Sequence, residues 1–254
     1  MDLSELCGRL DERLDTAAYA ELDASANGLQ VGPEAGEVET VAVAVDAAQA
    51  TAAEAIDRGA DLMITHHGYV WGSLDRVTGR TYDRVAPHVE HDLPLYVAHL
   101  PLDGHQELGN AAGVADLLDL RDREPFGAVG PAYAGQRGTA REPYSAIGLR
   151  ETLAAGTEGD QPVRMLDFGP EELREIAVVT GSGADYLDEA VAAGADALVT
   201  GEGKQQVYHE AREAGVTVAL AGHYATETFG VRALAGLCEE WGLETTYISH
   251  PTGL

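Results

Sequence analysis

A ten-residue stretch occurs twice in the sequence and sets the expectation for the fold. Residues 59–68 read GADLMITHHG and residues 194–203 read GADALVTGEG, so the copies align without a gap at a constant offset of 135 residues. Each copy holds a glycine suited to ending a helix, a short apolar strand and a polar strand end. The same offset aligns the apolar segment 41–45 with residues 176–180. We interpret this as a repeated strand–helix–strand unit. The alternative is chance similarity, because apolar strands resemble one another.

Strands and helices alternate outward from the repeat. The chain begins with an amphipathic helix over residues 3–14, and further short apolar strands are expected at 95–99, 216–221 and 245–249. This alternation predicts an α/β protein with mainly parallel strands, arranged as two related lobes with an internal repeat. A (β/α)₈ barrel is the alternative at this length. Residues 121–159, rich in glycine, proline and charge, offer too few strands for a barrel and favour a lobe boundary near their start.

Composition excludes several classes of function. The 254 residues carry 43 acidic against 16 basic side chains, a formal charge of −27, and 45% are hydrophobic, enough for a sizeable core. No basic stripe is available to neutralise nucleic-acid phosphates. The longest apolar runs, such as residues 41–45, are far too short to cross a bilayer. Two cysteines, Cys7 and Cys238, are too few for a thiolate metal site.

The acidic excess also predicts a habitat. Repulsion between carboxylates destabilises the compact state in dilute buffer but is screened within ~3 Å at molar salt. We interpret the charge as a halophilic adaptation, and an acidic enzyme of an ordinary cytoplasm is the alternative. Because the N-terminal residues lack the basic and apolar regions of a signal peptide, we expect a cytoplasmic protein.

Histidines and acids gather at the predicted strand ends. His66 and His67 follow one strand, His99 and Asp103 flank the end of a second, and His223 follows a third. The carboxyl ends of parallel strands share one edge of a sheet, where ligands bind. We therefore expect these side chains to converge on one crevice. The alternative is that His66 and His67 are loop histidines in solvent.

His223 and Glu227 lie four residues apart at a helix start, on one face of the helix. An imidazole and a carboxylate at this spacing suit zinc, iron, manganese or nickel, whereas the alternative is a pair placed by the helix dipole. With His66, His67 and Asp103 they form a set of five ligands. Because a single catalytic zinc takes about three protein ligands, five favour two divalent metal ions roughly 3.5–4 Å apart.

Other motifs fail on inspection. The Gly203-Lys204 pair resembles the end of a P-loop, but Leu198 occupies the first glycine position and Gln205 the Ser/Thr position. The segment 181–183, Gly-Ser-Gly, is interpreted either as an anion cradle at a helix start or as a tight turn.

Five motifs together resemble a known family. In chain order they are NGLQV at 27–31, THHG at 65–68, HLPLD at 99–103, ELGN at 107–110 and GHYATE at 222–227. They occur in the order found in the dinuclear metal-centre hexameric family named after a yeast NGG-interacting factor, the Nif-three-like proteins, or GTP cyclohydrolase I type 2 homologues. The matches extend over most of the chain.

The resemblance implies two α/β lobes, with the final helix and strand returning to the first. The expected domains are 1–122 with 219–254, which bind metal, and 123–218. It further implies two metals held by residues matching His66, His67, Asp103, His223 and Glu227, with His99 near them; we assign His99 the catalytic role. A toroidal homohexamer is implied as well.

Three hypotheses of function follow. The first is a dinuclear metal-dependent hydrolase of a nucleotide or other small heterocycle, cyclohydrolase-like, in which His99 moves or positions a proton. The second is a protein that binds and delivers a metal or metal cofactor without turnover. The third is an acidic scaffold for partner proteins. We expect a small-molecule substrate and neither nucleic acid nor membrane as partner.

Overall fold

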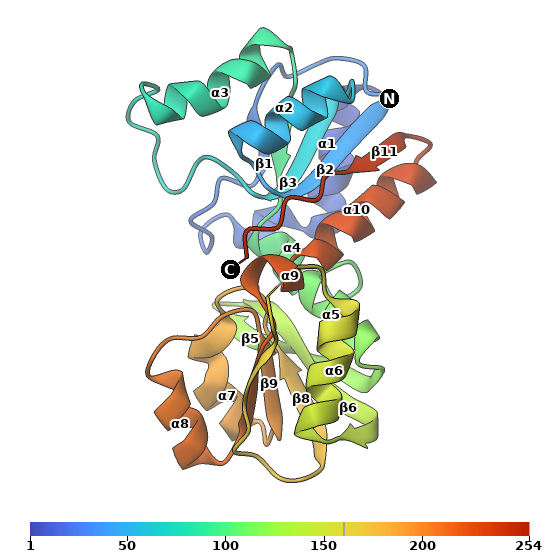
Figure 1. Ribbon diagram of the computed structural model, residues 1–254. Coiled ribbons are helices and arrows are strands. Elements are labelled where there is room, and N and C mark those ends of the chain that lie inside the picture. The colour runs from blue at the N-terminus through green and yellow to red at the C-terminus, as the bar shows by residue number, and fades with distance from the viewer. Residues whose placement is uncertain (160, 254) are drawn as a thin grey trace. The chain divides into compact units, whose positions relative to one another are not determined.

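The structure is a computed structural model that describes residues 1–159 and 161–253. The chain folds into two compact units, described here one at a time (Figure 1). Unit 1 comprises Met1–Leu102 and Gly230–His250, and unit 2 comprises Asp103–Phe229 and the residues from Pro251 onward. The chain passes between the units after Leu102, Phe229 and His250, whereas the predicted domain boundaries lie at residues 122 and 218. Those boundaries remain a prediction.

Unit 1 is built on a five-stranded mixed sheet with the strand order β1-β4-β3-β2-β11. Strands β4, β3, β2 and β11 run parallel, and β1 pairs antiparallel with β4 at the edge. The elements of this unit are α1 (Leu3–Leu14), η1 (Thr16–Tyr19), β1 (Gly28–Val31), β2 (Thr40–Asp46), α2 (Gln49–Asp57), β3 (Leu62–His67), α3 (Arg80–Glu90), β4 (Leu95–Val97), α10 (Thr228–Glu240) and β11 (Glu244–Tyr247).

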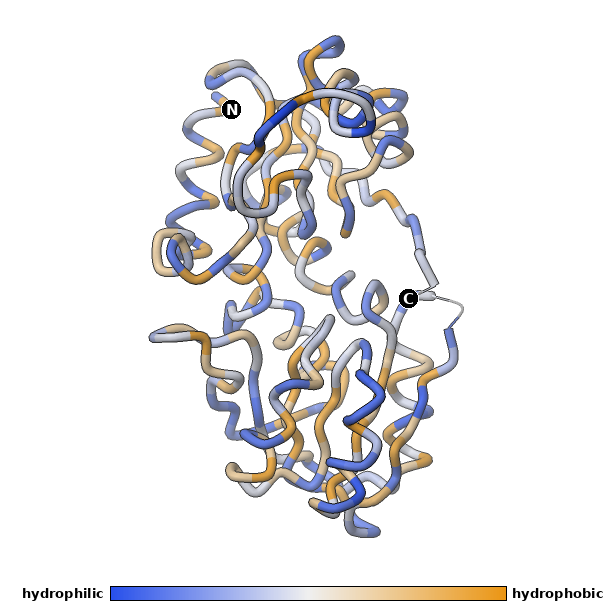
Figure 2. Tube along the Cα trace, turned by 90° about the vertical axis from the view of Figure 1, so that its left-hand side faces the viewer, coloured by the Kyte–Doolittle hydropathy of each residue, from blue (hydrophilic) through white to orange (hydrophobic). Residues whose placement is uncertain are grey.

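Helices cover both faces of this sheet. Side chains alternate between the two faces along each strand, so apolar residues of one strand pack on both sides. On one face Met63 and Leu95 pack with Ala52 of α2. On the other face the Tyr96 hydroxyl donates a hydrogen bond of 2.8 Å to the Asp11 carboxylate of α1. Figure 2 shows the resulting pattern, with hydrophobic strands inside and hydrophilic stretches along outer helices.

The final helix and strand pack on the sheet of unit 1, as expected. Strand β11 pairs in parallel with β2, with Thr245 opposite Val41. The Arg232 guanidinium of α10 lies 3.8 Å from the centre of the Tyr247 ring of β11. Strand β11 thus forms one edge of the first sheet.

Unit 2 is built on a six-stranded mixed sheet with the order β5-β6-β8-β9-β10-β7. Only β8, β9 and β10 run parallel, and α5 and α6 cover one face while α7 and α8 cover the other (Figure 1). The elements are α5 (Asn110–Leu117), β5 (Leu120–Val129), β6 (Ala132–Tyr144), α6 (Ala146–Gly156), β7 (Arg164–Leu166), β8 (Leu173–Val178), η2 (Gly183–Tyr186), α7 (Leu187–Ala192), β9 (Ala197–Thr200), α8 (Val207–Ala214), β10 (Thr217–Leu220) and α9 (His223–Thr226).

The expectation of mainly parallel strands is wrong for unit 2, and the error lies in residues 121–159. This segment contains the two longest strands, β5 and β6, paired as an antiparallel hairpin. Gly130 occupies the turn with a φ of 58°, which glycine adopts without strain. Charged residues occupy consecutive positions at the start of β5, so the sequence lacks the alternation of apolar and polar residues that marks a strand.

The repeated unit has the same register in both sheets. Val41 of β2 lies opposite Leu62 of β3, and Ile176 of β8 lies opposite Ala197 of β9, each residue displaced by the same 135 positions. In both units an antiparallel edge strand, β1 or β7, pairs with the next parallel strand, β4 or β10. Four strands of each sheet therefore correspond in order and direction.

In each unit one aspartate accepts hydrogen bonds from two backbone amides at the start of the repeated segment. Asp61 Oδ2 accepts hydrogen bonds of 2.9 Å from the backbone amides of Glu39 and Thr40. Asp196 Oδ2 accepts bonds of 2.8 and 2.9 Å from the amides of Arg174 and Glu175, again 135 residues on. These bonds explain why the Gly-Ala-Asp sequence occurs twice.

The strands of residues 1–159 and 161–253 form two open sheets, so the barrel alternative is wrong. None of the described helices has the length and apolar character needed to span a membrane.

Candidate metal centre

Two adjacent histidines end β3 in unit 1. His66 is buried and His67 is partly buried, and their ring centroids lie 4.6 Å apart. Along a regular strand neighbouring side chains point to opposite faces. Because β3 ends here, both rings lie together at the carboxyl edge of the sheet.

His99 joins this pair from the end of β4. Its ring centroid lies 5.1 Å from that of His66 and 5.7 Å from that of His67. One potential ligand atom from each of the three side chains lies within 4.8 Å of the others. Unit 1 by itself therefore gathers three of the four histidines of the predicted strand-end pattern.

Each of these imidazoles is oriented through Nδ1. His66 Nδ1 lies 2.9 Å from the carbonyl oxygen of Ala98, and His67 Nδ1 lies 2.8 Å from Asp46 Oδ1. With an acceptor at Nδ1, a neutral ring carries its proton there, and Nε2 is then the nitrogen able to ligate a metal. This is the arrangement by which outer acceptors orient metal-ligating histidines.

His99 is held by a buried carboxylate, Asp23. His99 Nδ1 lies 2.8 Å from Asp23 Oδ1, and the Asp23 side chain is 1% exposed. Burial raises the pKa of Asp23, but the hydrogen bond and charge of His99 outweigh it and lower the pKa to about 2. Asn27, from the NGLQV motif, donates to Asp23 Oδ2 at 2.8 Å and accepts from the His99 amide at 2.7 Å.

The remaining three sequence-predicted ligands belong to unit 2. His223 opens α9 after β10, with its Nε2 3.1 Å from Glu227 Oε1 and its Nδ1 3.2 Å from Glu202 Oε1. Burial lowers the pKa of His223, but the two carboxylates outweigh it and raise the pKa to about 9. Glu227 is nearly buried and occupies the junction between α9 and α10, where a single helix is predicted from the sequence.

Asp103 is oriented within the same unit. Asp103 Oδ1 accepts hydrogen bonds of 2.9 Å from Asn110 Nδ2 and 3.1 Å from Thr180 Oγ1. Asn110 belongs to the ELGN motif, and Thr180 follows β8. The motif thus contributes a partner for a carboxylate instead of a ligand of its own.

The glycine after Thr180 makes room for the two ligands from the end of β10. A Cβ atom at Gly181 would lie 2.3 Å from Glu227 Oε1 and 3.2 Å from His223 Nε2, and the φ of Gly181 is +58°. Ser182 Oγ donates a short hydrogen bond to Glu202. The Gly-Ser-Gly segment 181–183 therefore faces carboxylates, which favours the tight turn over an anion cradle.

Sequence reasoning missed Asp23, Asp46 and Glu202. Acidic residues are so common in this chain that composition does not distinguish these three. A signal was present for two of them: Asp46 ends the first strand of the repeat, and Glu202 is the counterpart of His67 at the 135-residue offset.

The functional residues lie close to the points where the chain passes between the units. The chain first passes from unit 1 to unit 2 within helix α4 (Leu100–Gly104), which follows His99 and contains Asp103. It returns to unit 1 after Phe229, two residues beyond Glu227. The ligands predicted from sequence thus come as two sets, one in each unit.

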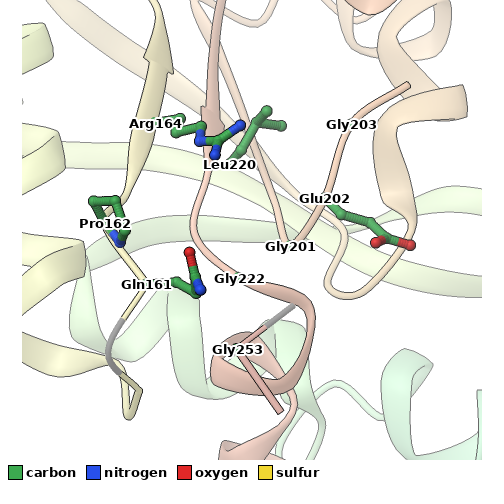
Figure 3. A pocket seen from close by; sticks show the side chains of 9 residues that line it. All are labelled: Gln161, Pro162, Arg164, Gly201, Glu202, Gly203, Leu220, Gly222 and Gly253. Atoms are coloured by element: carbon green, nitrogen blue, oxygen red, sulfur yellow. The ribbon is translucent and has the colours of Figure 1, made fainter. Parts of the chain in front are cut away.

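A cavity of about 220 Å³ in unit 2 adjoins the second set (Figure 3). Its wall includes Gly222, the neighbour of His223, and Glu202, the partner of His223. Figure 3 shows the Arg164 and Gln161 side chains on one side of the cavity, with the Glu202 carboxylate directed away from Arg164. Among the described residues no carboxylate forms an ion pair with Arg164. The cavity therefore offers a cation and an amide to a bound molecule.

The fold and the histidine–carboxylate sets define an α/β protein in which side chains that could hold a metal ion gather at strand ends. The chain belongs to the NIF3 family: the model of that family, described as Duf34/NIF3 (NGG1p interacting factor 3), matches residues 1–252.

Relatives are similar over their full length. The "GTP cyclohydrolase 1 type 2 homolog" of Halobacterium salinarum is 59% identical over 255 residues, and the protein of the same description from Pyrococcus horikoshii is 42% identical over 256 residues. The comparison covers 100% of both chains in each case. Among solved structures, TTHA1606 from Thermus thermophilus has a TM-score of 0.87 and 36% identity, with 100% of both chains covered.

Proposed function

We propose that this protein is a dinuclear metal-dependent hydrolase that acts on a nucleotide or another small heterocycle. The observation that carries the proposal is the cluster of His66, His67 and His99, in which an oxygen acceptor lies at Nδ1 of each ring. An acceptor at one ring nitrogen orients the other nitrogen for ligation, as is common around metal-binding histidines.

The proposed metal ligands are His66 and His67 of unit 1, together with the unit 2 residues Asp103, His223 and Glu227. Imidazole and carboxylate donors fit zinc, iron, manganese or nickel, and they fit two ions better than one. The glycine at position 181 supports the assignment, since a Cβ atom there would overlap Glu227 and crowd His223.

The metals, when bound, would supply a water molecule of lowered pKa as the attacking nucleophile. Hydrolysis of a ring carbon–nitrogen bond places the water oxygen on carbon and delivers one proton to the departing nitrogen. His99 is suited to that proton transfer, because the Asp23 carboxylate at its Nδ1 orients the ring beside His66 and His67. We therefore assign His99 the catalytic role.

A nucleotide substrate is supported by two observations. The relatives are described as GTP cyclohydrolase 1 type 2 homologs. The cavity beside His223 carries Arg164, and a guanidinium is suited to binding phosphate oxygens in two parallel hydrogen bonds.

Delivery of a metal or metal cofactor without turnover is the second candidate function. It is favoured by the contacts of His223 with Glu227 and Glu202, which place an imidazole and two carboxylates together in unit 2. The His223 and Glu202 side chains are 27% and 48% exposed, which suits a site that exchanges its metal with solvent. Turnover distinguishes the two functions.

We further propose that the two units arose by duplication and that the chain assembles as a toroidal hexamer. The shared register and the paired aspartates Asp61 and Asp196 support the duplication. The hexamer rests on the family resemblance, and the particle mass at molar salt should be six times the 26.7 kDa of one chain.

The test of the hydrolase is turnover of GTP by metal-loaded protein, followed by chromatography of the products. We expect ring-opened product from the wild type and a loss of at least about a hundredfold in His99→Gln, on the scale of general acid–base catalysis. His209→Gln, at an exposed histidine, is the matched control and should keep full activity. Bound metal with no turnover of GTP or of other nucleotides and heterocycles would overturn the hydrolase and leave the carrier.

A further inference from the structure

Trp71 is held in place and yet remains widely exposed. The indole Nε1 donates a hydrogen bond of 3.1 Å to the carbonyl oxygen of Gly68. The backbone of Trp71 forms an isolated bridge with Ser25, and the next amide, Gly72, donates to Ala24 at 2.6 Å. Despite these restraints 45% of the Trp71 surface is exposed. A large flat ring is thus presented in one orientation.

The ring lies against the histidine cluster of unit 1. The centroid of Trp71 is 4.9 Å from that of His99, with the planes at 79°, and 6.0 Å from that of His67. Edge-to-face contact of this kind fixes an aromatic pair more firmly than burial alone. A flat molecule lying on the indole would therefore have its edge next to His67 and His99.

We propose that Trp71 is the stacking surface for the base of a nucleotide, or for a similar aromatic heterocycle, at the His66-His67-His99 cluster. The inference rests on the proposed hydrolase and names how its substrate is recognised. Stacking uses the π-face that every base has, so Trp71 selects for a heterocycle as a class and against sugars and aliphatic acids. Choice among the bases falls to other groups.

A surface between copies of the chain is the rival role for this residue. Leu74 and Val77, farther along the same loop, are also 45% exposed. An interface would account for all three side chains, but it would not require the ring contacts of Trp71 with His67 and His99. Those contacts favour the heterocycle.

The test uses the fluorescence of Trp71 alone. The chain has two tryptophans, and Trp241 lies elsewhere in unit 1 near Arg9, so Trp241→Phe leaves Trp71 as the single reporter. The probes are GTP, guanosine and ribose 5-phosphate, each titrated into metal-loaded and metal-free protein with correction for nucleotide absorbance. GTP and guanosine should quench the emission, and ribose 5-phosphate should not.

Substitution at Trp71 supplies the second arm. In Trp71→Leu the affinity for guanosine, measured by equilibrium dialysis, should fall about tenfold or more, and Trp71→Phe should recover part of it. The metal content of both variants should equal that of the wild type. A change in particle mass with unchanged affinity for guanosine would overturn the inference in favour of an interface.

Failure of the inference is distinguishable from failure of the hydrolase. No quenching by guanosine in metal-loaded protein, or equal quenching by ribose 5-phosphate, would overturn the stacking role while the metal content stands. Quenching by guanosine in a protein that binds no metal would keep the stacking role and overturn the hydrolase.

Discussion

At the scale of single residues, the candidate centre depends on small side chains as much as on ligands. Gly181 faces two proposed ligands, and any β-carbon there would overlap the Glu227 carboxylate. Interior side chains in contact relax only partly, so the carboxylate would have to move. The geometry of the ligands is therefore sensitive to a single methyl group.

Gly181→Ala should lower metal affinity by about tenfold or more, the scale seen when groups supporting a metal ligand are altered. The matched control is Gly194→Ala. Gly194 also has a positive φ, 75°, but has no atom within 4 Å of its would-be Cβ. Both variants should lose stability through backbone strain, and only Gly181→Ala should lose metal in a binding titration. Equal metal affinity of the two variants would contradict the role of Gly181.

A second residue-scale prediction concerns His88, which lies outside the metal site. His88 is fully buried, with Nδ1 2.9 Å from the carbonyl oxygen of Leu93 and Nε2 3.2 Å from the Tyr69 hydroxyl. Burial lowers the pKa of His88, and the bond to Leu93 only partly offsets that effect. The unfolded chain therefore takes up a proton near pH 6.5, whereas the folded chain takes it up only at a lower pH.

The free energy of unfolding should accordingly fall as the pH drops below about 6.5, by up to about 1.4 kcal/mol per pH unit from this group. Denaturant unfolding of wild type and His88→Gln between pH 5 and 7 measures the contribution as a difference, since the other titrating groups are shared. His91→Gln, at an exposed histidine, should keep the wild-type slope. An unchanged slope in His88→Gln would show that His88 titrates alike in both states.

At the scale of elements, the structure is organised by the repeated strand–helix–strand unit. The aspartates Asp61 and Asp196 each bind two backbone amides at the start of that unit. A carboxylate is well suited to this because both amides converge on one oxygen. We therefore expect the two aspartates to stabilise their units alike.

Asp61→Ala and Asp196→Ala should each lower the free energy of unfolding of the unit concerned by about 1.5–3 kcal/mol, the range for hydrogen bonds to a charged group. Asp57→Ala, at an exposed acid near the end of α2, is the control and should have little effect. Hydrogen exchange measured per unit reports which unit is weakened. A loss confined to one of the two variants would count against equivalent roles.

Prediction from sequence succeeded where local patterns decide the element. Strand β3, which ends in His66 and His67, follows from an apolar run, and the end of the preceding helix follows from Gly59. The pairing of β11 with β2 follows from the family resemblance. The hairpin β5–β6 was missed, because charges on both sides of β5 hide its period. The outer acceptors Asp23 and Asp46 come from distant segments, so nothing local marks them.

At the scale of the whole molecule, charge is the dominant feature. The chain has a formal charge of −27 and Lys204 is its single lysine. Many of the arginines that form ion pairs do so with exposed neighbours, such as Arg9 with Glu5 and Arg174 with Glu172. Exposed pairs of this kind contribute little, so they do not offset the repulsion among the remaining carboxylates.

The unfolding temperature should therefore fall as salt is reduced from molar to about 0.1 M, where the screening length grows to about 10 Å. A thermal scan over a series of potassium chloride concentrations measures this. Sucrose at matched water activity separates screening from general stabilisation by solutes. An unfolding temperature independent of salt would show that the acidic surface is not an adaptation to it.

We propose above all that this chain binds two metal ions. The most direct test is elemental analysis of protein that has been stripped, saturated with zinc, iron, manganese or nickel, and desalted. We expect two ions per chain in the wild type and fewer in Glu227→Gln and in His67→Gln, one variant for each unit, while His209→Gln should retain two. A wild-type value near one would contradict the dinuclear centre, and a value near zero would contradict metal binding altogether.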